Sequence, residues 1–210
     1  GLSLDGGFLA AFASVHGIRR LTLYGSALGD GFGPGSDIDI LVEFRPEHTP
    51  GLLHLAQMEL ELEESSVGRS SSARLKTSAR TSVTRSSPPP DLSMQPEDRI
   101  RLRHLREAAG KALTYSDGKQ RSDLDDELLR LALTKLVEIV GEAAKSISPD
   151  GRAAIPDVPW RAAARMRDRL VHHYFDINLD VLWQTITEDL PRMLAALPSE
   201  DDLDRREDRP

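Results

Sequence analysis

The sequence contains no cysteine among its 210 residues. Without thiols the chain can form neither a disulfide framework nor a Cys-ligated zinc site, which fits a reducing compartment. The chain also lacks an uncharged apolar run near the roughly 18 residues that a membrane span requires, and no charged-then-apolar start resembles a signal peptide. We therefore expect a cytoplasmic protein with no membrane partner.

An excess of positive charge is also missing, because 27 Lys and Arg residues stand against 34 Asp and Glu residues, for a formal net charge of -7. Bulk attraction does not hold such a chain to nucleic acid. Any contact with RNA should therefore come from a local basic patch. One such patch is formed by Arg161, Arg165, Arg167 and Arg169.

The segment Ser65–Pro90 lacks Asp and Glu entirely, and it contains nine serines, three threonines, five Arg or Lys residues and three prolines. Such a composition buries little apolar surface, which favours a disordered linker over residues 65–93. A second interpretation is that a reading-frame slip fused two neighbouring genes and destroyed the end of the first. The coding DNA decides between these interpretations, since the slip requires a more hydrophobic alternative frame.

The regions before and after this segment have different secondary-structure patterns, which predicts two small domains. Residues 1–64 predict an α+β unit, with helices over Leu4–Val15 and Leu52–Glu64 and strands over Arg20–Tyr24 and Asp37–Phe44. Residues 94–198 predict an all-α helical bundle, with helices over Glu97–Tyr115, Asp123–Ile147, Pro159–Phe175 and Asp180–Leu197.

The boundaries and faces of the bundle helices follow from local signals. Ser122 and Asp123 are expected to cap the second helix and Asp180 the fourth, while Pro191 should kink or restart the fourth. The charged tail over residues 199–210 is predicted to be disordered. The expected apolar stripe of the second helix consists of Leu128, Leu131 or Ala132, Leu136, Ile139, Ala143 and Ile147.

In the first part, Gly25 and Ser26 are followed after ten residues by Asp37 and then by Asp39. Carboxylates on alternate strand positions point to the same side, where they can hold Mg²⁺ against nucleotide phosphates. Gly25 lets the backbone and the Ser26 hydroxyl approach a phosphate closely. The spacing therefore predicts a nucleotide-binding site.

This Gly-Ser and Asp-x-Asp pattern resembles the minimal nucleotidyltransferases of the polymerase-beta superfamily. The resemblance implies binding of Mg²⁺ and ATP, and it implies a third carboxylate on a later strand. That strand would fall in the acid-free segment, and Glu43 is a poor substitute because it lies beyond the pair. We therefore expect a truncated domain that binds nucleotide but has impaired transfer activity.

In the second part, the segment from Arg167 to Tyr174 combines residues suited to cleaving a phosphodiester. Asp168 and His172 are four residues apart, so the carboxylate can orient the imidazole on one helix face. Arg167 lies about 140° around a regular helix from His172. Convergence of these two on one phosphate requires either a distorted helix end or a second subunit.

The pattern Arg167, four residues, His172, one residue, Tyr174 resembles the HEPN superfamily, in particular the HepT-like ribonuclease toxins encoded beside nucleotidyltransferase antitoxins. Pro159-Trp160 and Val181-Leu182-Trp183 extend the similarity. The resemblance implies metal-independent RNA cleavage by 2'-hydroxyl attack, a homodimer, and modification of Tyr174 with AMP by a separate antitoxin. One departure is Asp168, which stands where the family usually has Asn.

The expected function is therefore that of a ribonuclease toxin, with Arg167 binding phosphate, His172 transferring protons and Asp168 orienting His172. Two alternatives remain open. The helical part could be a non-catalytic dimerisation module tethered to a nucleotide-binding domain. The first part could instead act as an adenylyltransferase that modifies Tyr174.

Overall fold

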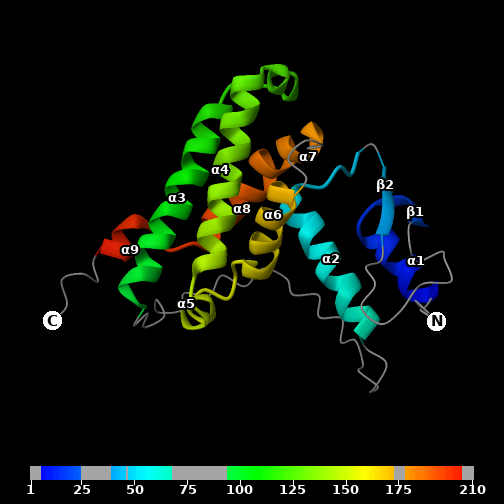
Figure 1. Cartoon of the computed structure of the whole chain (residues 1–210), viewed down its shortest axis with the longest axis horizontal. Coiled ribbons are helices and arrows are strands. Elements are labelled where there is room, and N and C mark those ends of the chain that lie inside the picture. The colour runs from blue at the N-terminus through cyan, green and yellow to red at the C-terminus, as the bar shows by residue number, and fades with distance from the viewer. Residues whose placement is uncertain (1–5, 25–38, 46, 68–93, 173–177, 205–210) are drawn as a thin grey trace. The chain divides into compact units, whose positions relative to one another are not determined.

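The computed structural model describes residues 6–24, 39–45, 47–67, 94–172 and 178–204 (Figure 1). The chain divides into two compact units, with the boundary after Pro50. None of the helices among the described residues is long and apolar enough to cross a membrane.

The first unit has an α+β composition, as predicted. Helix α1 (Gly6–Val15) is followed by strands β1 (Ile18–Tyr24) and β2 (Asp39–Phe44), which pair antiparallel. Gly17 joins α1 to β1 with a φ of 63°, a left-handed conformation that favours glycine. A Cβ at this position would also lie 2.6 Å from the His48 Cβ, so the turn requires glycine on both grounds.

The second unit is an all-α bundle, which confirms the predicted class. The long helices α3 and α4 lie side by side, and α6 packs against α4 and α2 (Figure 1). The elements of this unit are α2 (Leu52–Val67), α3 (Pro96–Ser116), the 3-10 turn η2 (Arg121–Asp125), α4 (Glu127–Ser146), α5 (Pro149–Ala154), α6 (Trp160–His172), α7 (Leu179–Gln184), the π-helical turn η4 (Thr185–Asp189), α8 (Leu190–Ala196) and α9 (Glu200–Asp204).

Helix α2 was predicted to belong with residues 1–64, yet it packs in the second unit. Its leucines at positions 52, 53 and 60 and its Ala56 are buried in the same core as α3, α4 and α6. An amphipathic helix is stable only where its apolar face is covered, and here the helical bundle covers it. The packing boundary therefore lies before α2, not after it.

The apolar stripe predicted for α4 is wrong at its start, because Leu128 and Leu131 are 79% and 58% exposed. The stripe that points into the core instead consists of Leu133, Val137, Val140 and Ala144. Both stripes have helical spacing, so periodicity alone does not choose between them. The neighbours α3 and α6 decide which one is buried.

Two predicted helix caps are also wrong. Asp126 caps α4 by accepting from the Leu129 N–H at 3.0 Å, because Asp123 lies in the preceding turn η2. Asn178 caps α7 by accepting from the Asp180 N–H at 2.9 Å. In each case several capping residue types stand close together, and the chain path selects one of them.

The tail predicted to be disordered contains the short helix α9, which corrects that prediction for residues 200–204. Ser199 accepts from the Asp202 N–H at 3.2 Å, and Leu203 is buried in the bundle core. One apolar side chain among many charged ones is a weak sequence signal. Its burial nevertheless ties the start of the tail to the bundle.

Pro191 restarts the last long helix, as predicted. Proline has no backbone N–H to donate within a helix. The residues just before Pro191 form a π-helical turn, in which the Leu190 N–H donates to the Thr185 carbonyl five residues earlier. Helix α8 then begins with Pro191 in its first turn. The same π turn directs Thr185 and Asp189 toward the start of α2.

Thr185 and Asp189 together cap α2 from more than 130 positions away in the sequence. The Leu52 N–H donates to the Thr185 hydroxyl at 2.7 Å, and the Leu53 N–H donates to the Asp189 carboxylate at 3.0 Å. The residue before α2 is Gly51, which has no side chain to act as a cap. Burial raises the pKa of Asp189 to about 6, although the backbone N–H groups of Leu53 and His54 lower it in part.

Asp189 therefore predicts a pH dependence of stability. Its folded pKa lies above the ordinary value of 3.8, so its contribution is full below pH 3.8 and is lost as the pH rises through 6. Between pH 7.5 and 4.5, we expect the free energy of unfolding of the wild type to rise by about 2 kcal/mol relative to Asp189→Asn. Urea denaturation at both pH values measures this, and exposed Asp157→Asn should keep the wild-type profile.

Helices α4 and α6 are in close contact at Gly141. A Cβ on Gly141 would lie 2.5 Å from the Arg167 Cβ and 2.9 Å from the Ala163 carbonyl oxygen. Real side chains do not approach so closely, so α6 would have to move away from α4. This contact sets the position of Arg167 relative to α4.

Gly141→Ala should therefore destabilise the fold by about 1–3 kcal/mol through overpacking, although alanine normally favours a helix interior. Gly110→Ala in α3 is a matched control, because a Cβ there meets no atom within 4 Å. The control should gain up to about 1 kcal/mol. Equal stabilisation of both variants in urea denaturation would contradict the close contact.

Candidate active site

Helix α6 carries the residues singled out for catalysis. Its start is anchored by Trp160, which is buried and donates its indole N–H to the Ile155 carbonyl at 2.9 Å. The helix then continues through His172. The remaining candidate on this segment, Tyr174, lies outside the described residues, as does the side chain of His172.

Arg167 faces α4 and is held between two carboxylates. Its Nε lies 2.8 Å from Glu142 Oε2, and its Nη1 donates to Asp168 Oδ1 at 3.1 Å. The side chain is 27% exposed, so the guanidinium is anchored but still reaches solvent. Such a group can present its remaining N–H donors to a phosphate.

Asp168 is bound by a residue that sequence reasoning missed. The Lys145 ammonium donates to both of its carboxylate oxygens, at 2.8 and 3.1 Å. This hydrogen bond lowers the pKa of Asp168, and Arg167 lowers it further against the opposing effect of burial. Asp168 is therefore ionised, and Lys145 balances the negative charge that it brings to the site.

The backbone of α6 fixes the relative directions of positions 167 and 172. Because α6 is α-helical from Trp160 through His172, it has no distorted turn between positions 167 and 172. The two positions therefore stay about 140° apart around the axis. The described backbone of one chain therefore does not bring these two positions together.

The basic patch expected on α6 is fully engaged by acidic residues. Arg161 pairs with Glu64 at 2.6 Å, and Arg165 pairs with Glu59 and Glu63, each through a bond of 2.7 Å. The hydrogen bond from Arg165 lowers the pKa of Glu63. Arg169 also donates to Glu59.

These acidic partners all lie on α2. We name Arg161, Arg165 and Arg169 the arginine row, and Glu59, Glu63 and Glu64 the acidic face of α2. The sequence indicated both, but not that they contact each other. The expectation of a free basic patch is therefore corrected for these three arginines.

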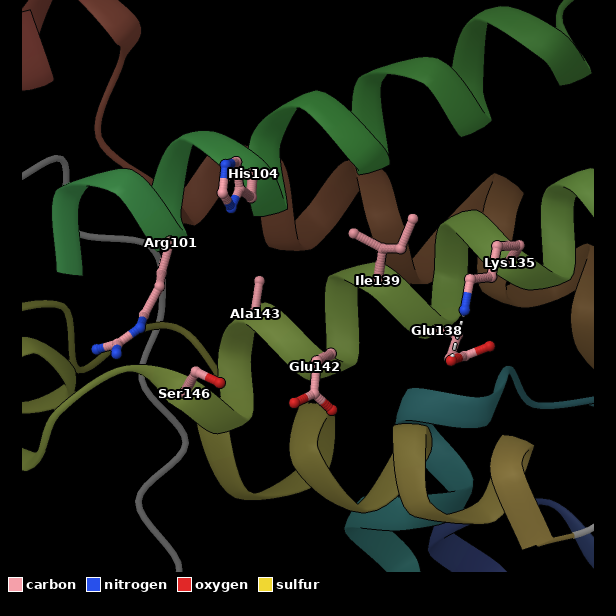
Figure 2. Close-up of a pocket in the computed structure, with 8 residues that line it drawn as sticks. All are labelled: Arg101, His104, Lys135, Glu138, Ile139, Glu142, Ala143 and Ser146. Carbon is pink, nitrogen blue, oxygen red and sulfur yellow. Dashed lines mark hydrogen bonds and ion pairs between the residues drawn. The ribbon is translucent and has the colours of Figure 1, made fainter. Parts of the chain in front are cut away.

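A hollow lies on the face shared by α3 and α4 (Figure 2). Its charged lining residues already have partners: Lys135 pairs with Glu138 at 2.9 Å, Arg101 with Asp98 at 3.3 Å, and Glu142 with Arg167. The wall of the hollow thus carries both positive and negative side chains. The hollow borders the Arg167 network through Glu142, but it offers no concentration of positive charge for a phosphate.

In the first unit, strand pairing places Asp39 opposite Tyr24, the residue that precedes Gly25. The register thus brings Asp39 next to the start of the predicted phosphate-binding turn. Gly25, Ser26 and Asp37 themselves lie outside the described residues. The side chain of Asp39 is likewise not described.

Glu43, expected to be a poor substitute for the third carboxylate, lies on strand β2. It pairs with Arg20 at 3.8 Å, on the opposing strand. Across the described residues as a whole, no three His, Asp or Glu side chains gather in a way that could hold a metal ion. The described residues thus contribute only Asp39 to the predicted magnesium site.

Comparison with known families finds two matches in this chain. The family model described as Ribonuclease HepT-like matches residues 105–199, and the model described as Nucleotidyltransferase domain matches residues 7–68. The second match ends one residue after α2. Helix α2 therefore lies within the residues that this model matches, although it packs in the helical bundle.

Curated relatives agree with the first match. A probable ribonuclease HepT of Thermococcus cleftensis is 44% identical over 70 residues, which cover 33% of this chain and 64% of that protein. A putative RNase of Methanocaldococcus jannaschii is 36% identical over 93 residues, or 44% of this chain and 85% of that protein. A second putative RNase of the same organism is 38% identical over 68 residues, which cover 32% of this chain and 56% of that protein.

The chain thus spans 64% and 56% of the length of two of these relatives and 85% of the other. No solved structure matches it at a significant level.

Proposed function

This chain belongs to the HepT-like ribonuclease family, and from that membership we propose that its helical unit is a metal-independent ribonuclease toxin of the cytoplasm. The observation that carries the proposal is the anchored Arg167, which is held by Glu142 and Asp168 and still reaches solvent. Charge-assisted bonds of this kind position a guanidinium for a phosphate. The family match and the relatives' names support RNA as the substrate.

The proposed reaction needs only groups that this chain supplies. His172 removes the proton from a ribose 2'-hydroxyl, whose oxygen attacks the adjacent phosphorus. The bond from phosphorus to the 5'-oxygen breaks, and His172 returns the proton to that leaving oxygen. Arg167 binds the phosphate and stabilises the charge that develops on it. The products are a 2',3'-cyclic phosphate and a free 5'-hydroxyl.

A homodimer is part of the proposal, because a regular α6 separates positions 167 and 172. In a dimer, Arg167 of one subunit can face His172 of the other across the interface. The exposed Leu128 and Leu131 of α4 support such an interface, since they leave apolar surface to be covered. Lys145 would keep Asp168 from repelling the scissile phosphate.

RNA cleavage tests this function. With EDTA present, the wild-type chain should cleave single-stranded RNA, while Arg167→Ala and His172→Ala should each reduce the rate by at least about 100-fold. Arg192→Gln is the matched control, because Arg192 is exposed on α8 and pairs only locally with Glu188. Gel analysis should show products that end in a cyclic phosphate.

Two outcomes would contradict the proposal. Cleavage that stops in EDTA would indicate a metal-dependent nuclease. If the wild type and His172→Ala are equally inert on RNA and equally harmless when expressed in a host, the helical unit is not a ribonuclease, which leaves the alternative of a non-catalytic dimerisation module.

For the first unit we propose nucleotide binding with impaired transfer. ATP and Mg²⁺ would be held by Gly25, Ser26, Asp37 and Asp39. The Mg²⁺ ion would neutralise the ATP phosphates. The third carboxylate of the family pattern is not supplied, because Ser65–Pro90 contains no Asp or Glu. Transfer of AMP should therefore be weak or absent.

We further propose that the activity is controlled at Tyr174 within a toxin-antitoxin system. A separate nucleotidyltransferase antitoxin would attach AMP to its hydroxyl, and the added anionic group would repel RNA. Mass spectrometry of the chain after incubation with ATP and such an enzyme should show AMP on Tyr174 and none on Tyr174→Phe. AMP added by the chain alone, and lost in Asp37→Ala, would show instead that the first unit is active.

A further inference from the structure

The acidic face of α2 occupies the arginine row of α6. We propose that α2 is an intramolecular mask, which holds the arginine row away from RNA phosphates and so restrains the helical unit. This inference rests on the proposed ribonuclease function for its effect on cleavage. Its effect on RNA binding can be measured independently.

Each arginine of the row has an acidic partner on α2, and the order of the pairs is regular. Glu64 meets Arg161, Glu63 meets Arg165, and Glu59 meets both Arg165 and Arg169. The two helices therefore run antiparallel, since the sequence numbers on α2 fall as those on α6 rise. The first turn of α2 lies toward the C-terminal end of α6, where the catalytic candidates stand.

Apolar packing and backbone caps, more than charge, hold α2 in place. Its leucines at positions 52, 53 and 60 are buried, and Thr185 and Asp189 bind its first N–H groups. Exposed ion pairs contribute little to stability. The charge of the acidic face is therefore not the main source of the stability of α2.

The arginine row is accessible enough for RNA to compete for it. The side chains of Arg161, Arg165 and Arg169 are 64%, 33% and 41% exposed. Phosphate binding requires guanidinium groups that are free to exchange partners. Three carboxylates in contact with three guanidiniums cancel the positive potential that would otherwise attract a strand.

Electrostatic complementarity between the helices supports a mask specific to this site. Helix α2 carries four glutamates and no Lys or Arg, whereas α6 carries four arginines and one aspartate. The chain as a whole is acidic, whereas this row places three arginines along one helix. Covering it removes a surface suited to binding RNA.

The test compares full-length chains in which three glutamates become glutamine. The unmasked variant carries Glu59→Gln, Glu63→Gln and Glu64→Gln, and it keeps every leucine of α2. The charge-matched control carries three exposed substitutions elsewhere in the bundle: Glu107→Gln, Glu127→Gln and Glu200→Gln. Binding of a fluorescent single-stranded oligouridylate is measured by anisotropy in a His172→Ala background, and cleavage is measured with His172 intact.

The unmasked variant should bind the oligouridylate about tenfold more tightly than the control at low salt. The slope of log Kd against log salt concentration should steepen by about 2 for this variant. Each of the three freed arginines would contact one phosphate, and each single-strand phosphate contact contributes roughly 0.7 to the slope. Adding Arg161→Gln, Arg165→Gln and Arg169→Gln should remove the whole gain. Should the triple variant fail to fold by circular dichroism, Glu63→Gln alone should give a smaller gain of the same sign.

The outcomes separate the two proposals. Affinity and salt dependence equal to those of the control, or a gain that survives loss of the arginine row, would overturn the mask. A gain in affinity with no cleavage by any variant would support the mask and overturn the ribonuclease function. Cleavage that rises together with affinity supports both.

Discussion

The close approach of α4 and α6 at Gly141 is the contact on which the candidate site depends. With no side chain at this position, the backbone of α6 lies directly against α4, and Arg167 comes within ion-pair distance of Glu142. The same spacing lets Lys145 reach Asp168. Ion pairs extend only about 4 Å, so a small separation of the helices would dissolve this network.

Helix α2 matches one domain by sequence and packs in the other. Its sequence matches the nucleotidyltransferase domain, while its apolar face completes the core of the ribonuclease-like bundle. The caps from Thr185 and Asp189 reinforce that second role, because they satisfy N–H groups that Gly51 leaves open. By sequence α2 falls within the nucleotidyltransferase match, and by packing it belongs to the second unit.

Much of the helical fold could be predicted because helix signals are local. The predicted limits of the helix at residues 97–115 differ from those of α3 by one residue at each end, and Pro191 restarts a helix as expected. The exposure of Leu128 and Leu131 could not be predicted, since two stripes of α4 have the same spacing and only packing chooses between them. The short helix α9 was missed because a single apolar residue, Leu203, holds it.

The sequence by itself determined the family and the candidate residues Arg167, Asp168 and His172, because their spacing is a property of one short segment. It also indicated a basic patch and an acidic helix as separate features. Only the tertiary structure decided that they pair, that Lys145 binds Asp168, and that a regular α6 holds positions 167 and 172 apart. Arg165 and Glu59 are 106 positions apart, and contacts over such separations depend on how whole helices pack.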